Sequence, residues 1–296
     1  MSGVYETVQI ATVDGRRLEV QVAGPEDGRA LVFHVGTPSA GRLFAPMVEA
    51  GSSWGVRHIT YSRPGYGGSQ RHAGRSVADC AADVAAIADE LGIDRFMTAG
   101  WSGGGPHALA CAAVLGERVI AAASIAGVAP FEADGLDWLD GMGQENIDEF
   151  AATAAGDAEL LAHLERNAPS MAAATAAGLL AGFGDLLCEV DRRALTGEFA
   201  QYLAGCTGAA VENGIWGWFD DDIAFYRAWG FDLQDISRPV TIWQGGQDRF
   251  VPYAHGQWLA RNVAGARGEL HPGHGHLSLV VESYGEILED LLAHVG

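Results

Sequence analysis

The fold is decided by residues 96–119, which read FMTAGWSGGGPHALACAAVLGERV. An apolar run typical of a buried strand comes first, and an Ala-rich helical pattern follows. Between the two, Gly100, Ser102 and Gly104 spell G-x-S-x-G, a spacing that holds a serine at a sharp strand-to-helix corner with its hydroxyl exposed. A loose glycine-rich loop is the alternative, because the chain contains 41 glycines. The strand before and the helix after favour the corner, and therefore Ser102 as a nucleophile.

Similar runs on either side extend this pattern into an α/β fold. Two alternating segments joined by a turn at Asp14-Gly15 predict an N-terminal β-hairpin. Further apolar runs, separated by helical patterns, predict a mostly parallel sheet with helices on both faces. The predicted strands are 5–13, 16–24, 30–35, 57–62, 95–100, 119–127, 240–243 and 268–271, and the predicted helices of the same region are 76–91, 106–115, 255–263 and 284–295.

The composition and the secondary-structure pattern of the sequence change near residue 130. From 131 to 230 the chain is Ala-rich, acidic and helical in pattern, and no strand pattern stands out. The strand signal returns after residue 238. We therefore expect a core formed by residues 1–130 and 231–296, with residues 131–230 inserted into it as a helical segment.

The charge balance argues against several classes of partner. The 296 residues include 38 acidic and 18 basic side chains, for a net charge of −20. Nucleic-acid binding needs clustered Lys and Arg, so neither nucleic acid nor an anionic membrane surface is expected as a partner. The N-terminus lacks the basic start and apolar segment of a secretory signal, and the four cysteines show no CxxC spacing. These features predict a reducing, cytoplasmic setting and a small-molecule substrate.

A serine nucleophile needs a base, and the C-terminal segment LHPGHGHLSL offers three histidines. His271 closes a predicted strand and should point along it. His276 follows a glycine and precedes the apolar run that leads into the last helix, so it is the favoured base, with His274 as the alternative. A zinc site is a further alternative, but three ligands within six residues of one loop are awkward to arrange, and that segment holds no carboxylate.

The base needs an acid that orients it, and Asp248 is the candidate. It stands in QGGQDRFVP, just after the predicted strand 240–243, and the glycines allow the chain to turn toward the site. The order Ser, Asp, His along the chain favours this role over that of a simple turn-capping residue. Asp134 and Glu132, in the loop after 119–127, are the fallback acids.

The developing oxyanion needs two backbone N–H donors. One should be that of Gly103, next after the nucleophile. The other should come from the loop HVGTPSAG after the first core strand, where the N–H of Thr37 is the candidate because Pro38 has none.

The motifs HVGTP, YSRPGYGGS, GWSGGG, QGGQD and GHGHLSL, in this order and at these separations, resemble the α/β-hydrolase fold superfamily over nearly the whole chain. The resemblance implies an eight-stranded, mostly parallel sheet with a helical cap inserted after the sixth strand. It implies Ser102, Asp248 and His276 as a catalytic triad, and Thr37 and Gly103 as the oxyanion hole. The chain departs from the family where Val35 and Ser62 stand in place of the usual His and Asp, which changes how the oxyanion loop is braced.

These residues predict a serine hydrolase that cleaves a small carboxylic ester or related acyl compound and requires no cofactor. Serine at the nucleophile position disfavours the haloalkane dehalogenase and epoxide hydrolase branches. A proline iminopeptidase-like enzyme is an alternative, although that branch resembles GGSWG where this chain has GWSGG, and a non-catalytic binding protein is another. Candidates for contact with substrate are Trp101, Trp216 and Trp218, the last two of which fit equally well as anchors of the inserted segment.

Overall fold

The structure is a computed structural model that describes residues 5–295. Eight strands form one sheet in the order β1-β2-β4-β3-β5-β6-β7-β8. The first two strands form the predicted antiparallel hairpin, β2 pairs antiparallel with β4, and all later pairings are parallel. The strands are β1 (Glu6–Ala11), β2 (Arg17–Ala23), β3 (Arg29–His34), β4 (Val56–Tyr61), β5 (Phe96–Trp101), β6 (Val119–Ile125), β7 (Val240–Gly245) and β8 (Arg267–His271).

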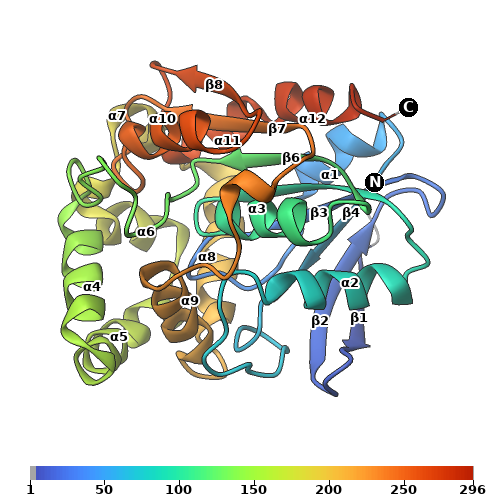
Figure 1. Cartoon of the computed structure of the whole chain (residues 1–296). Coiled ribbons are helices and arrows are strands. Elements are labelled where there is room, and N and C mark those ends of the chain that lie inside the picture. Colours follow the sequence, from blue (N-terminus) through green and yellow to red (C-terminus); the bar gives the residue numbers. More distant parts are fainter. Residues whose placement is uncertain (1–4, 296) are drawn as a thin grey trace.

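Helices cover both faces of the sheet, as predicted (Figure 1). On one face lie α2 (Cys80–Glu90), α3 (Gly104–Val114) and α10 (Tyr253–Asn262). On the other lie α1 (Ala45–Ser52), α11 (His276–Glu282) and α12 (Tyr284–Leu292). The sequence patterns do not predict α1 and α11, because helices of eight and seven residues are too short to show a clear period.

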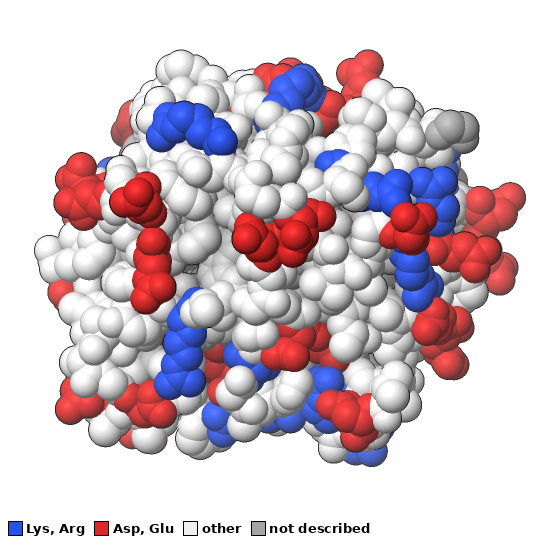
Figure 2. Space-filling model, in the orientation of Figure 1, with Lys and Arg blue, Asp and Glu red and all other residues white. Residues whose placement is uncertain are grey.

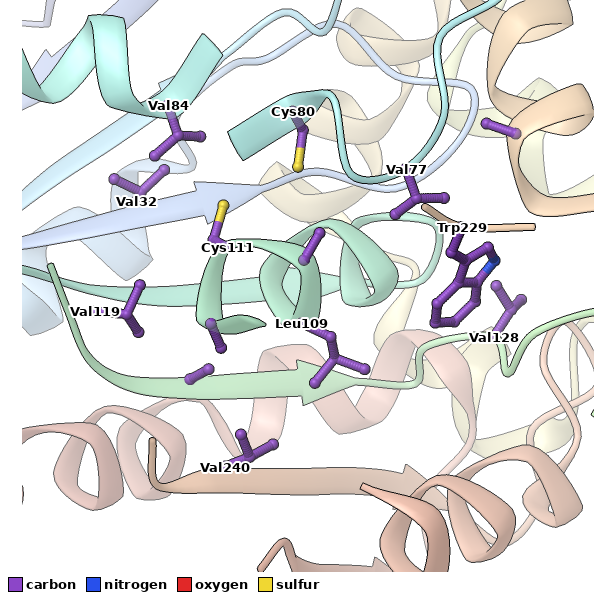
Figure 3. Close-up of a cluster of buried hydrophobic side chains, with 14 of the residues drawn as sticks. Val32, Val77, Cys80, Val84, Leu109, Cys111, Val119, Val128, Trp229 and Val240 are labelled. Atoms are coloured by element: carbon purple, nitrogen blue, oxygen red, sulfur yellow. The ribbon is translucent and has the colours of Figure 1, made fainter. Parts of the chain in front are cut away.

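The apolar core lies between the sheet and its helices. Figure 3 shows part of it, where Val84 of α2, Leu109 of α3 and Val32 of β3 belong to one buried cluster. Each of these side chains is excluded from water, and each contributes about 1.5–3 kcal/mol relative to exposure. The cluster fixes α3, and with it the corner at which β5 ends.

The helices of the inserted segment follow β6 and precede β7 in the chain, and no strand occurs in residues 131–230. Figure 1 shows most of them gathered at one end of the sheet, on the left, while both chain ends lie on the opposite side. We call them the cap; the boundary at 131–230 stays a prediction. They are α4 (Gln144–Ala155), α5 (Asp157–Ala172), α6 (Ala176–Gly182), the short 3-10 turn Gly184–Leu186, α7 (Glu189–Ala194), α8 (Gly197–Ala210) and α9 (Trp216–Tyr226), and the second 3-10 turn, Leu233–Asp235, follows them.

The surface carries the excess of acidic side chains expected from a net charge of −20. On the face shown in Figure 2, Asp and Glu side chains are spread between smaller groups of basic ones. Within residues 5–295, no helix is both long and apolar enough to cross a membrane.

Candidate active site

Ser102 occupies the corner between β5 and α3 with a strained backbone. Its φ is +57°, a left-handed conformation that is uncommon for a residue other than glycine. The turn is tight enough that a side chain on Gly100 would collide with the backbone of Gly104, and one on Gly104 would collide with that of His34. The Ser102 N–H donates to Ile125 O of β6 at 2.8 Å, which ties the corner to the neighbouring strand. The side chain is half-buried and faces the loop that contains Gly36.

Asp248 and His276 form a buried pair beside this corner. The carboxylate Oδ2 of Asp248 accepts a hydrogen bond from His276 Nδ1 at 2.8 Å and another from Gln244 Nε2 at 3.1 Å. Its Oδ1 accepts from the backbone N–H groups of Phe250 and Val251. Burial raises the pKa of Asp248, while the charge and hydrogen bond of His276 act in the opposite direction. Every oxygen is satisfied, so the imidazole is held in one orientation with Nε2 as its remaining ring nitrogen.

The fallback acids lie elsewhere. Asp134 and Glu132 are exposed, and Asp134 contributes its backbone carbonyl to a hydrogen bond from Trp258. Within residues 5–295 neither makes a hydrogen bond to His276, which leaves Asp248 as its carboxylate partner.

His276 is the first residue of α11, and a cap residue holds that helix end. Asp191, on α7, is fully buried. Its Oδ2 accepts from His276 N at 2.8 Å, and its Oδ1 accepts from Leu277 N at 2.9 Å and Ser278 N at 2.8 Å. The first backbone N–H groups of a helix have no acceptor within that helix, and this carboxylate supplies the acceptors for α11. The sequence gives no sign of the contact, since the two segments are 85 residues apart.

The two candidate oxyanion residues are neighbours. A side chain on Gly103 would collide with the hydroxyl of Thr37, so glycine is required where these backbones meet. The loop of Thr37 also passes close to Ser102, because a Cβ placed on Gly36 would lie 3.3 Å from Ser102 Cβ. The geometry therefore brings together the strained serine and the backbone segments expected to bind a developing negative charge.

A buried ion pair, which sequence reasoning misses, supports this loop. Arg63 and Asp221 are 1% and 0% exposed, and Arg63 Nη2 lies 2.6 Å from Asp221 Oδ2. Burial opposes the charge of Asp221, but Arg63 and Arg75 outweigh it and hold the pKa of that carboxyl below its usual value. Arg63 stands in the motif YSRPGYGGS, but Asp221 lies in a run of three aspartates, which in sequence suggests a solvated helix face; all three are buried.

Aromatic rings surround His276. Trp101 Nε1 donates to His276 O at 3.2 Å, and the two rings are 5.3 Å apart. The ring of Phe250 stacks on the imidazole at 4.7 Å. Trp101 therefore lies on the site side of the corner, between His276 and Phe199 of the cap.

The two cap tryptophans lie differently. Trp216 is exposed and stacks beneath the guanidinium of Arg71 at 4.0 Å. Trp218 is buried, packs in the same cluster as Tyr66 and donates through Nε1 to Glu149. Both make contacts that anchor the cap, and a role in substrate contact stays a prediction for each.

The three histidines of the C-terminal segment do not converge on one point, although the rings of His271 and His274 meet edge-to-face with centroids 5.5 Å apart. His271 stacks on Trp243, and His274 Nε2 lies 3.3 Å from a carboxylate oxygen of Glu282. Only His276 faces Asp248. Among residues 5–295, no group of three or more His, Cys, Asp or Glu side chains is arranged to hold a metal ion.

Comparisons with known proteins agree with this architecture. The family model of the alpha/beta hydrolase fold matches residues 29–283. A non-heme chloroperoxidase of Streptomyces lividans is 30% identical over 97% of this chain and 98% of its own, and a bifunctional esterase/perhydrolase of Acinetobacter calcoaceticus is 27% identical over 97% and 98%. Among solved structures, an esterase of Exiguobacterium antarcticum superposes with a TM-score of 0.74 over 98% of this chain and 99% of that one, at 22% identity. The chain belongs to the alpha/beta hydrolase fold family.

Proposed function

We propose that this protein is a serine hydrolase that cleaves a small carboxylic ester or related acyl compound through an acyl-enzyme on Ser102. One observation supports the proposal most: Ser102 is in a strained left-handed conformation at a strand-to-helix corner, and the neighbouring Trp101 contacts His276, whose Nδ1 is bonded to the buried carboxylate of Asp248. The names of curated relatives, an esterase/perhydrolase and an enol-lactonase among them, support the same class of acyl chemistry.

In the proposed acylation, each candidate residue has one role. Ser102 Oγ attacks the substrate carbonyl while His276 Nε2 removes its proton. Asp248 holds the imidazole and stabilises its positive charge. The N–H groups of Thr37 and Gly103 donate to the carbonyl oxygen as it becomes an oxyanion. The tetrahedral intermediate collapses, the C–O bond to the leaving group breaks, and His276 gives its proton to the departing alcohol.

Deacylation uses the same groups with water as the nucleophile. His276 removes a proton from water, which attacks the acyl carbonyl, and Ser102 leaves with that proton restored. Within residues 5–295, Ser102 Oγ makes no hydrogen bond, and the ring of His276 is bonded to Asp248 through Nδ1. Catalytic hydrogen bonds of this kind are often long without substrate and shorten in the complex.

The relatives also favour a second acyl acceptor. Hydrogen peroxide in place of water would convert the same acyl-enzyme into a peracid, and the names of two relatives contain perhydrolase and chloroperoxidase. This reaction needs no residue beyond those already named.

Turnover of a panel of 4-nitrophenyl esters, by wild type and Ser102→Ala, tests the proposal. We expect wild type to hydrolyse the esters and a fluorophosphonate to label Ser102 covalently. Ser102→Ala loses a triad member, so its turnover should be slower by a factor on the order of 10³ or more. Equal turnover by both proteins would refute the proposal. Folded wild type that neither turns over nor labels would support the non-catalytic binding protein instead.

The same preparation separates the remaining alternative. An amino-terminal peptidase would release nitroaniline from proline 4-nitroanilide faster than it hydrolyses the matched esters. We propose in addition a reducing, cytoplasmic setting, which is supported by the free state of Cys80, Cys111, Cys188 and Cys206.

A further inference from the structure

We propose that Asp221, a cap residue, is a positioning residue that fixes the loop of Thr37, whose N–H is a candidate donor of the oxyanion hole. The inference rests on the proposed function, because it concerns the same site. It goes beyond that function by assigning part of the catalytic geometry to the cap, which the sequence predicts only as an inserted helical segment.

The first connection is direct. Thr37 Oγ1 donates to Asp221 Oδ2 at 2.7 Å, and the same oxygen accepts from Tyr66 Oη at 2.9 Å. Asp221 lies on α9, 184 residues after Thr37. The residue whose backbone N–H is expected to meet the oxyanion is thus tied by its side chain to a fixed, charged acceptor on the cap.

The second connection runs through Arg63. Its guanidinium is paired with Asp221 and donates to three successive residues of the oxyanion loop: Val35 O, Gly36 O at 2.9 Å and Thr37 Oγ1 at 2.8 Å. The loop is therefore held by charge-assisted hydrogen bonds in a water-free setting, where they are strong. Arg63 supplies the brace for a loop that has Val35 in place of the family's usual histidine.

The other candidate donor, Gly103, contacts the same helix of the cap but not Asp221 itself. His107 Nδ1 donates to Gly103 O at 2.7 Å, and its Nε2, 4.0 Å from Asp221 Oδ1, makes no hydrogen bond among residues 5–295. One turn further along α9, Phe225 abuts Gly103, since a Cβ placed on that glycine would lie 3.0 Å from Phe225 Cζ. Gly103 is thereby confined by α9 as well as by its own helix.

These contacts matter for catalysis because oxyanion donors act by being in place before the charge develops. A buried carboxylate with two arginine partners has one low-energy arrangement, and displacing it would leave charges uncompensated. Misplacement of a catalytic group by about 1 Å lowers rates on the order of 100-fold. We therefore expect loss of this anchor to lower kcat rather than to weaken substrate binding.

The test compares Thr37→Val, Thr37→Ser, Asp221→Asn and the control Asp220→Asn. Thr37→Val keeps the backbone N–H and the branched shape but removes the hydroxyl, whereas Thr37→Ser keeps the hydroxyl. Asp220 is the neighbour of Asp221 on α9, is also buried and pairs with Arg71 instead, so its variant controls for loss of a cap ion pair. All rates are expressed per active site, titrated to completion with a fluorophosphonate.

We expect Thr37→Val and Asp221→Asn to lower kcat on the order of 10- to 100-fold with KM changed less than about twofold. A trifluoromethyl ketone, whose adduct with Ser102 carries the oxyanion, should lose affinity by a similar factor. Asp220→Asn should stay near wild type, and Thr37→Ser, which keeps the hydroxyl, should recover most of the kcat lost in Thr37→Val. A merely structural role for Asp221 would lower the titrated fraction while kcat per site stayed constant.

Two results would overturn the inference. One is a kcat per titrated site of Thr37→Val within about threefold of wild type, and the other is unchanged ketone affinity in that variant. Thr37→Val decides the matter even if Asp221→Asn fails to fold, because it leaves the buried ion pair intact. Either result, with wild type active and Ser102→Ala inactive, would leave the proposed function standing.

Discussion

The contact of Asp191 with α11 leads to a prediction for stability. Asp191→Ala removes a carboxylate that accepts hydrogen bonds from three successive backbone N–H groups, those of His276, Leu277 and Ser278, and from the Ser278 hydroxyl. Loss of a helix N-cap costs about 0.5–2 kcal/mol, and each buried N–H left without a partner costs about 1–3 kcal/mol. Because these losses overlap, we expect a total on the order of 3–5 kcal/mol.

Asp191→Asn refines the prediction. An amide that keeps its oxygen at the position of Oδ1 retains the bonds from Leu277 and Ser278, but it turns an NH₂ group toward the N–H of His276. We expect a smaller loss of stability, about 1–2 kcal/mol, together with a lower kcat, because the residue set free is the candidate base.

Thermal and urea unfolding measure both effects. With roughly 2–4 °C per kcal/mol for a domain of this size, Asp191→Ala should melt about 10 °C below wild type. Glu189→Gln is the matched control: Glu189 lies on the same helix, its side chain is 73% exposed, and among residues 5–295 its one ion pair is with Arg193, so the melting temperature of this variant should hardly change. If Asp191→Ala melted within about 2 °C of wild type, the capping argument would be refuted.

Two further predictions concern single residues. Ser102→Gly should be more stable than Ser102→Ala by about 1 kcal/mol, because only glycine adopts a φ of +57° without strain, and both should be inactive; equal melting temperatures would contradict the strain. Burial raises the pKa of Glu149 from 4.5 to about 7, and its neighbour Asp222 is shifted in the same direction. At each raised group the folded state keeps a proton that the unfolded state releases, so stability should fall as pH rises from 4.5 toward 7, and Glu149 alone contributes at most about 1.4 kcal/mol per pH unit to this slope. Glu149→Gln should flatten that slope in melts between pH 4.5 and 8, and an unchanged slope would show that Glu149 is not its source.

The fold could be predicted from sequence because its signals are local. Each core strand is a short apolar run, and the hairpin is marked by its turn, so all eight strands lie within a few residues of their predicted positions. The corner at Ser102 is equally local, since strand, glycines and helix are contiguous. The Asp248–His276 pair needed only the order of elements, because the carboxyl ends of parallel strands meet at one edge of a sheet.

The supports of the site could not be predicted in this way. Asp221 and Asp191 contact residues 184 and 85 positions away, and nothing in their own neighbourhoods sets them apart from the other acids of the cap. A run of three aspartates suggests solvent exposure. The three-dimensional structure shows instead that all three side chains are buried, each among different neighbours. Long-range pairing of charges is a property of the assembled fold and has no signature in local pattern.

The close packing around Gly105 explains why this position of the corner is a glycine. A Cβ on Gly105 would lie 2.6 Å from Ser124 Oγ and 2.8 Å from Gly127 Cα, so α3 leaves the corner in close contact with the end of β6. Ser124 and Gly127 come 19 and 22 residues after Gly105 in the chain, so the motif itself does not show this requirement.

Two of the buried cap aspartates, Asp191 and Asp221, restrict how this enzyme can be re-engineered. A designer who wished to widen its substrate range would naturally transplant another cap onto the same core. Such a chimera would lose both the carboxylate that caps α11 and the carboxylate that anchors the Thr37 loop, unless the new cap had carboxylates at both positions. Grafts that preserve α7 and α9 and vary only α4 to α6 are therefore the ones expected to keep the chemistry while changing what it acts upon.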